Sequence, residues 1–127
     1  MDDHVLLEAY KYRTSHYLNG TGDVTAIHLG ERVVAHLTQP AAATARAAAA
    51  TAATELREIL WDAIHAVAFK GVHPGFRDAY AWATLVQCAM DPSTYATAAS
   101  VDLAILLGTG FYRDLLLQTL LATTTAT

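Results

Sequence analysis

Apolar side chains recur at helical spacing along most of this chain. Between residues 55 and 70 they fall three and four positions apart, which indicates one apolar face of an amphipathic helix. This face comprises Leu56, Ile59, Leu60, Ala63, Ile64 and Val67. Comparable patterns predict further helices over residues 2–19, 23–38, 41–54, 76–90, 94–107 and 111–122. Because the sequence has no repeat and no sustained alternation of strand period, we predict an all-α fold.

Helix boundaries are marked by residues that favour turns and caps. Asn19-Gly20 ends the first helix, and Asp23 or Thr25 caps the second, which stops before Pro40. Residues 41–54 are rich in alanine, whose helix propensity favours a helix over a flexible tract. Lys70-Gly71 places a cation and a glycine where the helix that starts at Glu55 is expected to end.

The segment 76–90 is apolar on nearly every face, so we expect it at the centre of the fold. Trp82 should then be buried against Leu56, Leu60 and Ile64. The expected architecture is one compact domain over residues 1–127, with about six helices around a buried central helical hairpin. Residues 123–127 should form a weakly ordered tail.

Composition narrows the classes of partner. Hydrophobic residues make up 54% of the chain and charged residues 16%, which disfavours disorder. Eight Lys and Arg stand against twelve Asp and Glu, giving a net charge of -4 without a basic patch. We therefore expect neither nucleic acid nor an anionic membrane surface as a partner.

A cytoplasmic location is expected from three features. Cys88 is the only cysteine and has no internal disulfide partner. The start, Met1-Asp2-Asp3-His4, is acidic where a signal peptide would be basic. Charged residues, including Asp102 and Arg113, interrupt the apolar C-terminal third before it reaches the length of a membrane span.

Candidate chemistry is concentrated between Gly71 and Asp78. Pro74 favours a helical first turn, and Gly75 permits close approach of the backbone. Free amides at a helix start suit an anion or a carbonyl oxygen, and His73 immediately precedes them, where a general base would be well placed. Asp78 could orient this histidine, hold a cation or stabilise the helix dipole; spacing alone favours a simple helix cap.

Two other groups of residues have more ordinary interpretations. One helix face carries Glu58, Asp62 and His65. A carboxylate-bridged metal site needs two Glu-x-x-His motifs, whereas the chain offers only Asp62-x-x-His65 and a reversed His28-x-x-Glu31. We expect no metal site there. Cys88 has no cationic neighbour one helical turn away that would stabilise a thiolate, so we expect a core residue and not a nucleophile.

The segment His73-Pro74-Gly75-Phe76-Arg77-Asp78 resembles the Fic/Doc signature, His-Pro-Phe-x-Asp/Glu-Gly-Asn-Lys-Arg, with Gly75 as one additional residue. Weaker similarities to small Doc proteins lie in Leu60 to His73, Gly20 to Pro40 and Val101 to Leu120, so that the resemblance covers residues 4–121.

This resemblance implies an all-helical enzyme whose histidine deprotonates a target hydroxyl. The loop and helix start would hold nucleotide phosphates with Mg²⁺ on the acidic residue, and the enzyme would transfer AMP or phosphate to a protein. The chain departs from the signature after Asp78, because Ala79-Tyr80-Ala81-Trp82 replaces Gly-Asn-Lys-Arg. These replacements remove the charge-assisted donors that a triphosphate requires.

Three functions follow as alternatives. In the first, the scaffold performs acid/base chemistry on a small organic molecule without a cofactor, with His73 and Asp78 as catalytic residues; Gly75, Phe76, Arg77, Tyr80 and Trp82 would bind the substrate between His73 and Trp82. In the second, the protein is a catalytically inactive binding or regulatory module that meets a protein partner or a second copy through its apolar C-terminal helices. The third keeps AMP or phosphoryl transfer, with ATP and Mg²⁺ bound through substitute contacts.

Overall fold

The N-terminal segment is a continuous helical rod with a widened turn in its middle. The computed structural model describes residues 2–39, 42–68 and 71–125. In it α1 (Asp3–Ala9), the π-helical turn η1 (Tyr10–Thr14) and α2 (Ser15–Gly20) follow one another directly, where the sequence predicted one helix over 2–19. The Asp2 carboxylate caps this rod by accepting a hydrogen bond from the His4 amide at 3.1 Å. Such widened turns inside α-helices shift the following side chains around the axis.

The next two helices confirm the predicted cap and join two predicted segments. α3 (Val24–Leu37) starts at Asp23, whose carboxylate accepts a hydrogen bond from the Ala26 amide. α4 (Ala43–His65) unites the alanine-rich stretch with the periodic stripe, and its buried alanines allow close packing on α3 and α5. It ends at His65, five residues before the expected stop at Lys70, which lies outside the described residues.

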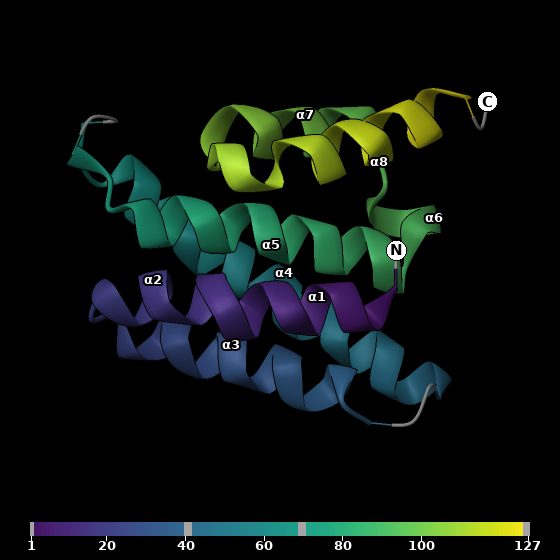
Figure 1. The fold of residues 1–127 in the computed structure, drawn as a ribbon, viewed down its shortest axis with the longest axis horizontal. Coiled ribbons are helices and arrows are strands. Elements are labelled where there is room, and N and C mark those ends of the chain that lie inside the picture. The colour runs from purple at the N-terminus through teal and green to yellow at the C-terminus, as the bar shows by residue number, and fades with distance from the viewer. Residues whose placement is uncertain (1, 40–41, 69–70, 126–127) are drawn as a thin grey trace.

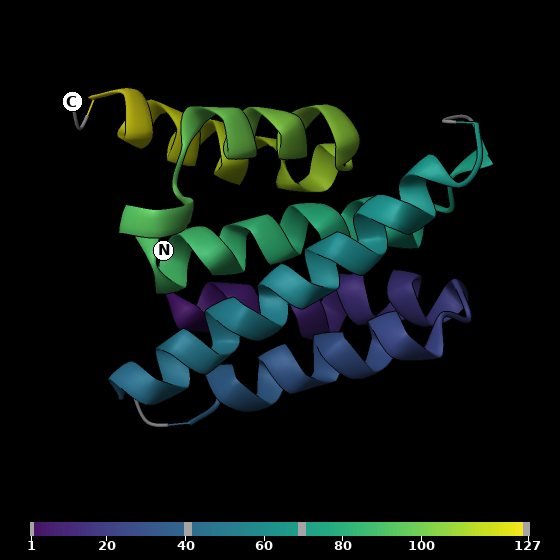
Figure 2. The same cartoon turned by 180° about the vertical axis from the view of Figure 1, so that it is seen from behind.

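α5 (Pro74–Met90) is the central element of the fold. Thirteen of its residues are buried, because it is apolar nearly all round and is covered from several sides. The rod α1–α2 and α3 lie on one side of it, and α4 crosses behind it (Figures 1 and 2). The expected central hairpin thus corresponds to α4 and α5, and the all-α class is confirmed.

The C-terminal third forms a helical hairpin over the edge of α5. The predicted helix 94–107 is divided into α6 (Pro92–Tyr95) and α7 (Ala98–Leu107), because Thr97 adopts an extended conformation and caps α7 through the Ser100 amide. The short 3₁₀ turn η3 (Gly110–Tyr112) then leads into α8 (Arg113–Thr125). α8 extends to Thr125, where a weakly ordered tail was expected from residue 123; residues 126 and 127 lie outside the described residues.

Across the three described stretches, no helix combines the length and the apolar character that crossing a membrane requires.

Candidate functional site

His73 caps the central helix. Its Nδ1 atom accepts a hydrogen bond from the Gly75 amide at 2.9 Å, as a side chain at an N-cap does. Since Nδ1 is the acceptor, this geometry assigns the proton of the neutral ring to Nε2. His73 is exposed, and its ring lies beside Gly20 at the end of α2. The rings of His73 and Phe76 are arranged edge to face, with 6.3 Å between their centroids.

Asp78 lies one helical turn further along α5 and is completely buried. Its Oδ1 accepts hydrogen bonds from Arg13 Nε and Thr109 Oγ1, both at 2.8 Å, and its Oδ2 accepts one from Thr14 Oγ1 at 2.8 Å. The carboxylate therefore joins η1, α5 and the α7–η3 turn. We call Asp78, Arg13, Thr14, Thr109 and Tyr112 the Asp78 cluster.

The other members of the Asp78 cluster complete a closed polar network. Because the Thr14 hydroxyl donates to Asp78, the Tyr112 hydroxyl donates to Thr14. Tyr112 is fully buried, and burial raises the pKa of its phenol, so it stays protonated as this donor. The Arg13 guanidinium lies over the rings of Tyr17 and Phe111, at 4.8 and 4.4 Å from their centroids.

The expected pairing of Asp78 with His73 is not what the structure shows. Both carboxylate oxygens already have partners from other segments, and Nδ1 of His73 is occupied by the cap. An orienting carboxylate would have to accept a hydrogen bond from an N–H group of the histidine ring. Of the roles that the sequence left open for Asp78, orientation of His73 has no hydrogen bond to support it, because Arg13, 65 positions away, binds the buried carboxylate instead.

The residues expected to surround a substrate also have structural partners. A Cβ at Gly75 would overlap the backbone oxygen of Tyr17, so this glycine allows α2 and α5 to approach closely. Arg77 donates from Nε to the Leu107 carbonyl and from Nη2 to the Gly108 carbonyl, which caps the end of α7. Phe76 is half-buried against the core.

Trp82 is buried as expected, and its hydrogen bond and its ring contact are with the N-terminal rod. Its Nε1 donates to the Leu6 carbonyl at 3.0 Å, and its ring lies 4.6 Å from that of Tyr10. The indole is fully enclosed, so it does not line an opening toward His73. Of the residues predicted for the site, only Tyr80 lines one of the three cavities described below.

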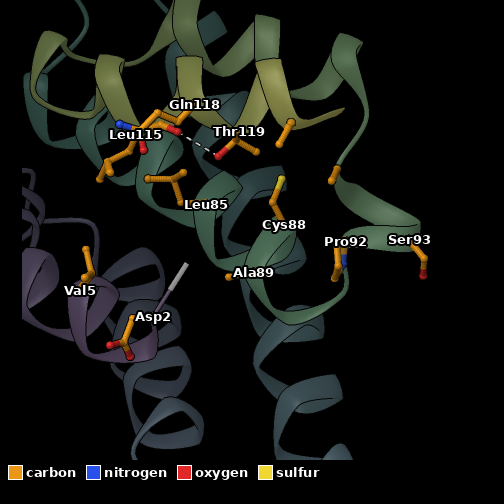
Figure 3. A pocket seen from close by; sticks show the side chains of 12 residues that line it. Asp2, Val5, Leu85, Cys88, Ala89, Pro92, Ser93, Leu115, Gln118 and Thr119 are labelled. Carbon is orange, nitrogen blue, oxygen red and sulfur yellow. Dashed lines mark hydrogen bonds between the residues drawn. The ribbon is translucent and has the colours of Figure 1, made fainter. Parts of the chain in front are cut away.

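Two neighbouring open cavities lie between the α1–α2 rod and α8, and we treat them together as one groove because they share lining residues. One part, of about 610 Å³, lies at η1 and includes Tyr12, Tyr17 and Phe111; the other, of about 700 Å³, lies over Leu85 and Cys88 of α5. Val5 and Leu115 line both parts. In Figure 3 the side chains of Val5, Leu85, Cys88 and Leu115 lie around the second part, with α1 on one side and α8 on the other. We call this feature the α1–α8 groove.

The α1–α8 groove presents mainly apolar side chains. Tyr12 is 72% exposed and Phe111 51%, although each has apolar neighbours within the groove. Exposed apolar side chains that line one groove are the kind of surface that interaction sites use. Cys88 lies at its floor, where burial raises the pKa of the thiol to about 11, so it is a neutral wall residue at physiological pH, as expected from the sequence.

The third cavity, of about 460 Å³, lies between α4 and α5 around Arg57, Trp61 and Tyr80. Glu58 and Asp62 are at its rim. Nδ1 of the nearby His65 donates a hydrogen bond to the Trp61 carbonyl oxygen at 2.8 Å. The described residues include no group of three or more His, Cys, Asp or Glu side chains that could hold a metal ion.

Sequence reasoning missed both the α1–α8 groove and the arginine in this third cavity. The sequence does not bring Tyr12 and Phe111 together, because their positions relative to each other depend on how α8 packs. Arg57 flanks the apolar stripe of α4, as many charged residues of amphipathic helices do, so the sequence alone did not single it out.

Comparisons with models of protein families, with curated proteins and with solved structures gave no match to this chain. The resemblance to Fic/Doc proteins therefore stays a prediction.

Proposed function

We propose that this protein is a binding module that holds an amphipathic helix of a partner protein in the α1–α8 groove. The observation that carries the proposal is the exposure of Tyr12 and Phe111 on facing walls of an apolar channel. A partner helix with an apolar stripe would cover these rings and remove them from water.

The shape of the groove favours a helix over a compact small molecule. Its lining extends along the rod from Asp2 to Tyr17, which at 1.5 Å per residue is about 22 Å of helix axis. This length matches a partner helix of about four turns. α1 and α8 also run in opposite directions along the groove, so an added helix would pack between two existing ones (Figure 1).

Charge along the groove adds one requirement for the partner. Asp2 and Glu8 line it, and in the described part of the chain the ion-pair partner of Glu8 is His4, at 3.9 Å. Arg13, in contrast, is already paired with Asp78. We therefore expect the partner helix to carry lysine or arginine beside its apolar stripe.

The geometry of the Gly71–Asp78 loop supports binding over catalysis. His73 and Asp78 each act in the fold, and the pair needed for acid/base chemistry is not assembled. Catalysis by His73 alone, on a small molecule or with nucleotide and Mg²⁺, stays a prediction without a cavity described at this residue. The single cysteine supports the proposal of a cytoplasmic protein.

A synthetic probe tests the groove directly. A helical peptide of about 16 residues with a leucine stripe and flanking lysines should bind, and a peptide of the same composition with the stripe scrambled should bind much more weakly. Fluorescence anisotropy of the labelled peptides measures both affinities.

Matched variants locate the binding surface. Tyr12→Asp should weaken binding of the amphipathic peptide by about tenfold or more, because it places a charge in the apolar channel. Leu106→Asp changes an equally exposed apolar residue on α7 outside the groove lining and should leave the affinity unchanged. Equal affinity for both peptides, or equal weakening by both substitutions, would exclude the groove as the binding site.

A further inference from the structure

Arg57 is a partly buried cation whose hydrogen-bond partners are all neutral. Nη1 donates to Gln87 Oε1 at 2.7 Å and to Ser100 Oγ at 2.9 Å, and Nη2 donates to the Tyr80 hydroxyl at 2.6 Å. Nε is buried and has no hydrogen-bond partner. Within residues 2–39, 42–68 and 71–125, no carboxylate lies close enough to form an ion pair with this guanidinium.

The groups that surround Arg57 hold it firmly in place. The Gln87 side chain donates in turn to Thr54 Oγ1 at 2.8 Å, and the Tyr80 ring lies 4.6 Å from the guanidinium carbon. Tyr80 and Gln87 are themselves almost completely buried. A partly buried charged group that is held by neutral partners and has no carboxylate bonded to it costs stability, and it remains able to pair with an anion that enters the cavity.

The cavity beside Arg57 has a different character at its outer edge. Its volume is about 460 Å³, within the range of small-molecule sites. Trp61 forms an aromatic wall that is 38% exposed, and the exposed acids Glu58 and Asp62 stand one helical turn apart on the same rim. The lining thus offers a cation and an aromatic wall together with two anions.

We propose that this α4–α5 cavity binds a small zwitterion of the α-amino acid class. The carboxylate of the ligand pairs with Arg57, its ammonium faces Glu58 and Asp62, and its side chain lies against Trp61. A ligand with only an anionic group would meet repulsion from the two acids, and one with only a cationic group would leave Arg57 without a counter-charge.

This site is independent of the proposed function. Its lining residues belong to α4 and α5, two helices whose crossing Figure 2 shows, and none of them lines the α1–α8 groove. Failure of one proposal therefore leaves the other standing.

The first experiment uses the unaltered protein and free α-amino acids as probes, added one at a time. At least one should raise the midpoint of thermal unfolding by several degrees at about 10 mM, because a ligand that binds only the folded state stabilises it. The amide of that amino acid, which lacks the carboxylate, and its N-acetyl derivative, which lacks the ammonium, should each bind about tenfold or more weakly by calorimetry.

Substitutions then assign the two ends of the ligand. Arg57→Gln should abolish the shift, whereas Arg32→Gln, at an exposed arginine of α3 outside the cavity, should leave it unchanged. The double variant Glu58→Gln with Asp62→Asn alters only exposed residues. It should reduce the ratio of the affinity for the free amino acid to the affinity for its N-acetyl derivative. Asp102→Asn, at an exposed residue of α7, is the control.

Two results would overturn the proposal. The first is the absence of a shift with every amino acid in the unaltered protein. The second is equal binding of the free and capped forms, which would show that the charges of the cavity do not select the ligand. Should Arg57→Gln fail to fold, the capped ligands and the Glu58–Asp62 variant still decide the question.

Discussion

At the scale of single residues, Asp78 shows how a carboxylate can look catalytic in sequence and act structurally in the fold. Its three donors come from η1 and from the turn before η3, so that one buried anion fixes three segments. Arg13 neutralises its charge and is shielded by two aromatic rings. Such a network is strongly stabilising only while it is complete.

Asp78→Asn should therefore destabilise the protein by about 3 kcal/mol, because Arg13 keeps its charge and loses its counter-ion. This is well above the roughly 1 kcal/mol expected if Asp78 interacted only with the helix dipole. His73→Ala, which removes one cap bond, should cost about 1 kcal/mol and serves as the comparison. Urea unfolding of both variants gives the two values. Equal, small losses would contradict the role assigned to the Asp78 cluster.

The sequence predicted His73 and Asp78 as notable residues, and both do have defined tasks at the start of α5. Their partners were beyond sequence reasoning, because Arg13, Thr14 and Thr109 are brought to Asp78 only by the packing of separate elements. Trp82 is similar. Its burial followed from the apolar segment around it, but its contact with Leu6 depended on where the N-terminal rod lies.

At the scale of elements, the start of α5 is pressed against the end of α2. A Cβ at Gly75 would overlap the Tyr17 carbonyl oxygen and would approach Thr21 Cγ2 to 2.7 Å. The first of these atoms belongs to the backbone, so the overlap cannot be relieved by turning a side chain. The two helices would have to separate.

Gly75→Ala should consequently destabilise the protein by about 1–3 kcal/mol, the range for overpacking of a filled interior. An ordinary glycine inside a helix would respond in the opposite direction, with a gain of up to about 1 kcal/mol from the better helix propensity of alanine. Gly110→Ala, where nothing lies within 4 Å of the added atom, is the matched control and should change stability by less than about 0.5 kcal/mol. Thermal or urea unfolding shows whether the free energy of unfolding falls or rises. A stabilised Gly75→Ala variant would refute the close packing of α2 on α5.

Most helices could be predicted because their signals are local. The Asp23 cap, the periodic stripe of α4 and the all-round apolar character of α5 each depend on neighbouring residues only. Two boundaries differ from the pattern. A new helix starts at Ala98 because Thr97 caps it, and α4 ends at His65, earlier than the pattern indicates. The π-helical turn at Tyr10–Thr14 has no sequence marker. It contains Arg13 and Thr14, which both donate hydrogen bonds to Asp78, and this contact between distant segments could not be predicted from the sequence.

At the scale of the whole molecule, the wall that α8 contributes to the α1–α8 groove is the less firmly held of the two. The start of the α7–α8 hairpin turn is tied to α5 by Arg77 and by the Thr109–Asp78 bond, and Tyr112 and Leu116 are buried there. Toward its C-terminal end α8 is half-buried or exposed, as at Gln118 and Leu121.

This difference predicts a gradient of hydrogen exchange along the molecule. Amides of α5 should exchange only through global unfolding, whereas those of α8 beyond Gln118 should exchange at least about 100-fold faster through local opening. Amides near Leu116, close to the anchored turn, should be intermediate. Native-state exchange followed by NMR measures all three groups in one sample.

A bound amphipathic peptide should slow exchange in the C-terminal half of α8 selectively, because it would pack against that wall and would have to leave before the wall opens. Protection of α8 equal to that of α5 in the free protein would show a rigid groove. Slowing spread evenly over the whole chain would instead indicate stabilisation without a defined contact on α8.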